Sequence, residues 1–92
     1  MYTIQNFGYD LKQLLKKTNN IVEIANFCFQ IMNYTRDTED GVDDIACTLA
    51  LMEEGEGFEY TIKELNEIAD RLIAGDRIIT QLGIDPKVKL RG

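Results

Sequence analysis

The hydrophobic pattern is strongest between residues 21 and 34, where ten of the fourteen residues are apolar. The four polar residues, Glu23, Asn26, Gln30 and Asn33, recur three, four and three positions apart. On a helix this spacing leaves one narrow polar stripe, whereas a surface helix usually has the reverse balance. The pattern therefore predicts a central apolar helix over about residues 20–34, covered on most sides by other helices or by a second chain.

Residues 3–17 predict a first helix, because large apolar residues recur there at helical spacing. Gly8 interrupts the pattern and leaves two possible starts. Thr3 could cap one long helix, or Asp10 could cap a shorter one with a capping box. We expect a helical turn before Gly8 and a secure helix from Asp10.

A third helix is expected from about Asp40 to Glu54, with Thr38 or Asp40 as its cap and Gly55 as its end. Residues 45–52 are apolar with one interruption by threonine, so we expect this half of the helix to be buried nearly all round. Its predicted inner face consists of Val42, Ile45, Ala46, Leu49 and Met52.

The clearest helix start in the sequence follows Tyr60. Thr61 is the expected cap, and Glu64, three residues on, completes a capping box. We interpret Gly75 as a break, followed by a short last helix that ends at Gly83; one long helix is the alternative. After it, lysine and arginine alternate with apolar residues and predict an extended tail.

Together these segments predict an all-α fold, a compact bundle of four to five short helices around the central apolar helix. We expect residues 1–84 to form a single helical domain and residues 85–92 to form an extended basic C-terminal tail. No segment shows sustained alternation with turn dipeptides, so a sheet is not expected.

Missing residue types exclude several kinds of chemistry. The chain has no histidine, serine or tryptophan. It therefore cannot form a Ser-His or Cys-His nucleophile pair or the usual Cys/His zinc site, and we expect no metal, no cofactor and no catalytic residue.

Cys28 and Cys47 each lie in an apolar run, which predicts buried, reduced thiols. With no visible signal peptide and no apolar run of about 20 residues, we expect a cytoplasmic protein without a membrane span.

Charge is distributed unevenly along the chain. Residues 1–36 hold two acids and four bases, residues 37–76 hold thirteen acids and two bases, and residues 77–92 hold one acid and four bases. These net charges of +2, −11 and +3 sum to −6. An acidic centre repels nucleic acid and favours the approach of a basic partner, although it could also serve only to keep the protein soluble.

The leading functional hypothesis is a non-enzymatic, acidic helical module that docks on the basic surface of a protein partner. Inhibitors, immunity proteins and phage-encoded antagonists are of this type. The predicted contacts are the acids of the central region with two aromatic anchors, namely Asp43, Asp44, Glu53, Glu54, Glu56, Phe58, Glu59 and Tyr60.

Two alternatives remain open at this point. A structural or regulatory homodimer would form if the two most apolar helices packed against those of a second copy. A magnesium-dependent all-α hydrolase would use carboxylates three residues apart on two helices. Those carboxylates are Asp40, Asp43 and Asp44 on one helix and Glu64, Glu67 and Asp70 on the other.

Overall fold

The computed structural model describes residues 1–54 and 60–76. These residues form four α-helices and one 3-10 turn, which confirms the predicted all-α class. The expected last helix after Asp76 and the tail 85–92 lie outside the described residues. In chain order the elements are α1 (Ile4–Lys17), α2 (Ile21–Tyr34), α3 (Val42–Ala50), η1 (Leu51–Glu54) and α4 (Ile62–Ile73).

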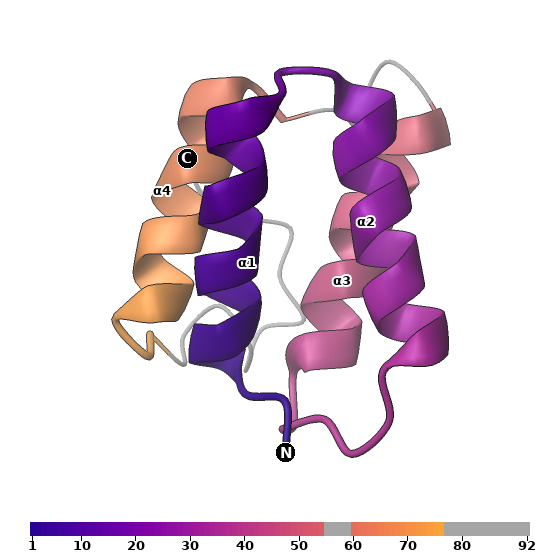
Figure 1. The fold of residues 1–92 in the computed structure, drawn as a ribbon, viewed down its shortest axis with the longest axis vertical. Coiled ribbons are helices and arrows are strands. Elements are labelled where there is room, and N and C mark those ends of the chain that lie inside the picture. Colours follow the sequence, from indigo (N-terminus) through magenta and orange to yellow (C-terminus); the bar gives the residue numbers. More distant parts are fainter. Residues whose placement is uncertain (55–59, 77–92) are drawn as a thin grey trace.

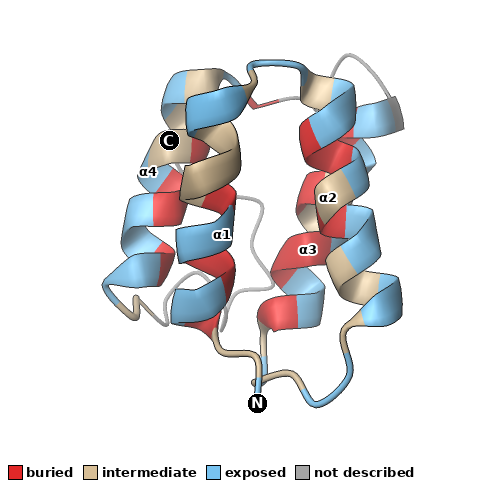
Figure 2. Cartoon of the chain, viewed as in Figure 1, coloured by how far each residue is buried: buried red, intermediate tan, exposed pale blue. Residues whose placement is uncertain are grey.

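The helices are arranged as two pairs. α1 packs along α4, and α2 packs along α3 and η1, whereas α1 and α2 touch only slightly (Figure 1). Buried faces of both pairs turn toward the space between them (Figure 2). None of the described helices is both long and apolar enough to span a membrane.

Sixteen apolar residues of the described chain are buried and form one core cluster. All four helices contribute to this cluster, together with Met52 of η1 and Tyr60. No polar or charged residue is buried among the described residues. The core is therefore a single apolar layer shared by the two helix pairs, which is how a domain of this size gains most of its stability.

The expected central position of α2 is not confirmed. Only three of its fourteen residues are buried, at Ile24, Ala25 and Cys28. Val22 is 52% exposed, Phe29 48% and Tyr34 78%. Because the core lies between the two pairs, α2 buries one face on it and leaves apolar side chains on its outer face.

The expectation that residues 45–52 are buried nearly all round is also wrong. The predicted inner face of α3 and η1 is buried in full. Cys47 and Leu51, however, are exposed. α2 covers α3 from one direction only, so these two side chains stay open to solvent at the edge of the contact between α2 and α3.

α1 is one continuous helix capped by Thr3, which corrects the expected start at Asp10. The Thr3 hydroxyl accepts from the Asn6 N–H at 3.0 Å, and the Asn6 side chain accepts from the Thr3 N–H at 3.1 Å. This capping box satisfies two backbone donors at the helix start. Gly8 does not break the helix. It lies where α1 packs directly against α4.

α4 begins and ends as the sequence predicts. Thr61 and Glu64 form the expected capping box, with bonds of 3.0 and 2.8 Å. At the other end Gly75 adopts φ +77°, and the N–H groups of Gly75 and Asp76 donate to the carbonyls of Leu72 and Arg71. This pattern is a Schellman motif, in which glycine accommodates the left-handed turn that ends the helix.

The connector between α2 and α3 binds the N-terminus of the chain. Tyr2 donates its N–H to the Asp37 carbonyl and accepts from the Glu39 N–H, both at 2.9 Å. The Glu39 side chain also accepts from the Ile4 N–H at 2.9 Å. A carboxylate at this position satisfies a free donor and complements the positive end of α1.

The predicted side-chain cap of α3 is wrong. Gly41 occupies the cap position in the left-handed region, with φ +95° and no side-chain bond. Thr38 instead forms an isolated bridge with Tyr2. The connector is used to attach the N-terminal segment, so neither Thr38 nor Asp40 caps the helix that follows.

Candidate functional site

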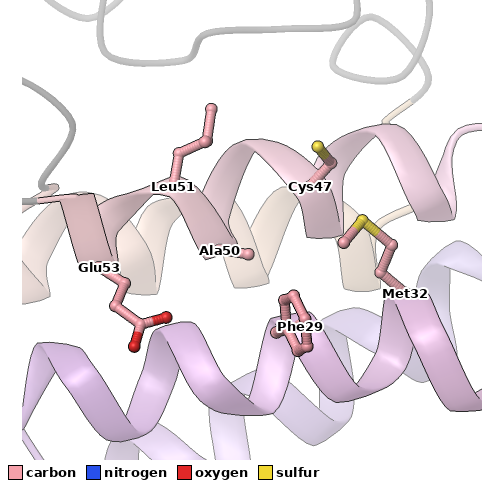
Figure 3. Close-up of a pocket in the computed structure, with 6 residues that line it drawn as sticks. All are labelled: Phe29, Met32, Cys47, Ala50, Leu51 and Glu53. Atoms are coloured by element: carbon pink, nitrogen blue, oxygen red, sulfur yellow. The ribbon is translucent and has the colours of Figure 1, made fainter.

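An open groove lies between α2 on one side and α3 with η1 on the other (Figure 3). Its volume is about 420 Å³. The residues that line it are Phe29, Met32, Cys47, Ala50, Leu51 and Glu53.

Helical spacing places the lining residues of each helix on one face of that helix. Phe29 and Met32 are three residues apart on α2, and Cys47 is three residues before Ala50 on α3. Residues at this spacing are neighbours on a helix surface. In Figure 3 Phe29 lies between the two helices, Met32 and Cys47 lie toward one end, and the Glu53 carboxylate lies at the opposite end.

One acidic side chain lines an end of the groove, and two more lie within one helical turn of Cys47. Glu53 lines one end and is exposed. Asp43 and Asp44 are exposed in the first turn of α3, four and three residues before Cys47. The segments 21–34 and 42–54 contain no lysine or arginine. The apolar surface is therefore framed by negative charge that no base on the same three elements compensates.

The two thiols differ in their surroundings, which corrects the expectation that both are buried. Cys28 is buried, and burial raises the pKa of its thiol far above the ordinary value. Cys47 is exposed on the wall of the groove. No disulfide joins them.

The predicted contact residues are not all at this site. Asp43, Asp44 and Glu53 are exposed on α3 and η1. Tyr60 is 4% exposed and belongs to the core cluster, so in this structure its ring packs inside the chain. The remaining four fall outside what the structure describes, because Glu54 is described for its backbone only and Glu56, Phe58 and Glu59 lie in the range 55–59.

Sequence reasoning missed the apolar half of the groove. It assigned Phe29, Cys47 and Leu51 to covered surfaces, because they lie in the two most apolar helices. The available signal was the apolar excess itself, which a chain of 92 residues has difficulty covering. That signal identifies the helices but not the side of each helix that stays exposed.

Carboxylates needed for the magnesium alternative are on different helix pairs. Asp43 and Asp44 lie in the first turn of α3, whereas Glu64 and Asp70 lie on α4. Asp70 forms a 2.9 Å ion pair with Lys12 of α1. Across residues 1–54 and 60–76, no three potential ligands of the His, Cys, Asp or Glu type are close enough to hold a metal ion. The described geometry therefore gives this alternative no support.

Comparison with known proteins yields no relative, since no family model, no curated protein and no solved structure matches the chain. Functional reasoning consequently depends on the chemistry of the groove and its charges.

Proposed function

We propose that this chain is a non-enzymatic protein-binding module that docks on a basic surface of its partner, in the manner of an inhibitor or immunity protein. The observation that carries the proposal is an exposed groove lined mostly by apolar residues, with Glu53 at one end, Asp43 and Asp44 within one helical turn of Cys47, and no base on α2, α3 or η1. A basic partner would be attracted by the acids and held by apolar contacts.

Two further features support a binding role. Val22, Phe29, Tyr34 and Leu51 are large apolar residues left exposed on the same helix pair. Phe29 and Leu51 line the same groove, and exposed apolar side chains that lie together commonly mark an interaction site. The acids beside it are exposed, so they keep their charge available to a partner without the desolvation cost that buried charges carry.

Charge reversal tests this proposal. The variant carrying Asp43→Lys, Asp44→Lys and Glu53→Lys should lose the basic protein that the wild-type chain captures from a lysate of its own cells. Mass spectrometry identifies the captured protein, and its isoelectric point checks the expected basic character. The physical reason is that like charges across an interface oppose both encounter and binding.

A matched variant controls for net charge. Glu23→Lys, Asp40→Lys and Glu67→Lys change three exposed acids outside the groove by the same amount. This variant should keep most of the capture. If both triple variants lost capture equally, the loss would reflect net charge alone. If both retained capture equally, the acids beside the groove would have no role in binding.

A homodimer is a second candidate, favoured by the exposed apolar side chains of α2. A second chain packed on that face would cover the exposed apolar side chains of α2. Sedimentation equilibrium over a hundredfold concentration range tests this idea. A dimer that Val22→Lys with Tyr34→Lys converts to a monomer would support it, and a wild-type monomer throughout would exclude it.

A further inference from the structure

We infer that the groove between α2 and α3–η1 receives an amphipathic helix of the partner, with apolar residues on one face and lysine or arginine beyond each end of that face. The inference rests on the proposed function and adds the form of the docking segment. It is carried by the apolar residues that line the groove, by Glu53 at one end, and by Asp43, which lies one helical turn before Cys47 beyond the other end.

The apolar part of the groove suits side chains that project from a helix. Its walls are themselves two helices, and the lining residues Phe29, Met32, Cys47 and Ala50 follow their axes (Figure 3). An apolar face with residues at i, i+3, i+4 and i+7 is the usual way in which a helix occupies such a groove. Met32 adds a flexible, polarisable wall that adapts to the shape of the inserted side chains.

The acidic ends determine the charge of the occupant. Asp43 and Glu53 are ten residues apart along α3 and η1, which corresponds to roughly 17 Å at rises of about 1.5 Å per residue in an α-helix and about 2.0 Å in a 3-10 helix. A partner helix lying along the groove would therefore place its bases about three turns apart to meet both ends. Opposite charges at each end also fix the position of the helix along the groove.

A second copy of this chain does not satisfy the same charges. If two grooves faced each other about a two-fold axis, acids of one copy would meet acids of the other in either orientation, because both ends are acidic. Residues 21–34 and 42–54 supply no base to compensate. Like charges across an interface disfavour association, so a basic partner of different sequence fits this groove better.

A synthetic peptide tests the inference on the full chain. The probe is an alanine-based helix with leucines at i, i+3, i+4 and i+7 and lysines at i−3 and i+8, which lie about three turns apart. We expect it to bind, as measured by fluorescence anisotropy of a dye at its N-terminus, and to bind more weakly as salt is raised. We also expect it to slow alkylation of Cys47, which lines the groove.

Two aromatic residues of α2 provide a matched pair of variants. Phe29 lines the groove and Tyr34 does not, and both are exposed. Phe29→Ala should weaken binding of the peptide by about tenfold, as loss of an apolar anchor commonly does, whereas Tyr34→Ala should leave it nearly unchanged. Equal effects of the two substitutions would overturn the assignment of the groove.

Control peptides separate this inference from the proposed function. A peptide of the same composition with its leucines spread around the helix keeps the charge but lacks the apolar face. Equal binding of that peptide would overturn the helix-in-groove inference and leave acidic docking intact. Binding of a version with glutamates in place of the lysines would count against both, and absence of binding by the original probe would overturn the inference alone, since capture of a basic partner is measured separately.

Discussion

Gly8 shows how one residue determines the distance between two helices. A Cβ atom built at Gly8 would lie 2.6 Å from Leu72 Cβ and 2.9 Å from both the Ala69 carbonyl oxygen and the Ile73 nitrogen. Two of these three neighbours belong to the backbone of α4, so they cannot move away without shifting the helix. The absence of a side chain at Gly8 therefore permits the close packing of α1 against α4.

Gly8→Ala should lower the free energy of unfolding by roughly 1–3 kcal/mol, the usual cost of overpacking a close contact. The loss is expected even though alanine is the better helix former by about 0.5–1 kcal/mol. Urea unfolding followed by circular dichroism measures it. Lys16→Ala, at the exposed end of the same helix, is the control and should change stability little; a stable Gly8→Ala protein would contradict the close approach.

The two cysteines allow a second prediction at the scale of single residues. In the native protein Cys47 should react rapidly with Ellman's reagent, and Cys28 should react only when the chain unfolds. Cys28 is protected because it is buried and because burial raises its pKa, which leaves little thiolate at neutral pH.

Thiol titration in buffer and in denaturant checks this order of reactivity. Cys47→Ala should remove the fast phase completely, and Cys28→Ala should leave it unchanged. Two fast thiols in the native protein would show that α2 does not bury its inner face as the structure has it.

At the scale of elements, the helix starts are the best example of local determination. Asn20 caps α2 by accepting from the N–H groups of Val22 and Glu23. Thr61 and Glu64 form their capping box in the same way. Each cap involves residues only two or three positions apart, so the interaction does not depend on distant parts of the chain.

Thr61→Ala should lower the free energy of unfolding by about 1 kcal/mol, because it removes the acceptor for the Glu64 N–H. Thr61→Ser keeps the hydroxyl and should retain most of the stability. Thermal or urea unfolding of the two variants makes the comparison. If serine cost as much as alanine, packing of the threonine methyl group, and not the cap, would explain the loss.

At the scale of the whole molecule, the two helix pairs are joined by the core and by the connector between α2 and α3. The hydrogen bonds of Tyr2 with Asp37 and Glu39 attach the start of α1 to that connector. The Glu39 carboxylate reaches the Ile4 N–H across 35 residues of sequence. One acid of the acidic region therefore acts in the fold, and not on a surface offered to a partner.

Glu39→Ala should lower the free energy of unfolding by about 1–2 kcal/mol, because a charged acceptor is lost and a partly buried donor is left unsatisfied. Asp40→Ala, at the exposed neighbouring position, is the control and should have little effect. Chemical unfolding measures both. Equal stability of the two variants would show that the connector does not hold the helix pairs together.

Sequence alone determined the helical class, the inner face of α3, both ends of α4 and the acidic character of the middle of the chain. These features depend on periodicity and on contacts within one or two turns, which are present wherever the chain folds. Gly8 shows the limit of such reasoning, because a glycine in a helical pattern is a break or a packing site according to what lies opposite it. Only the tertiary structure supplies α4 as that neighbour.

Only the tertiary structure likewise decided which apolar residues remain exposed. Ile24 and Phe29 belong to the same apolar helix, yet the first is in the core and the second lines a groove. Leu49 and Leu51 differ in the same way on α3 and η1. The side of each helix that another helix covers depends on the pairing of α1 with α4 and of α2 with α3, and long-range packing of this kind is not encoded in the local spacing of apolar residues.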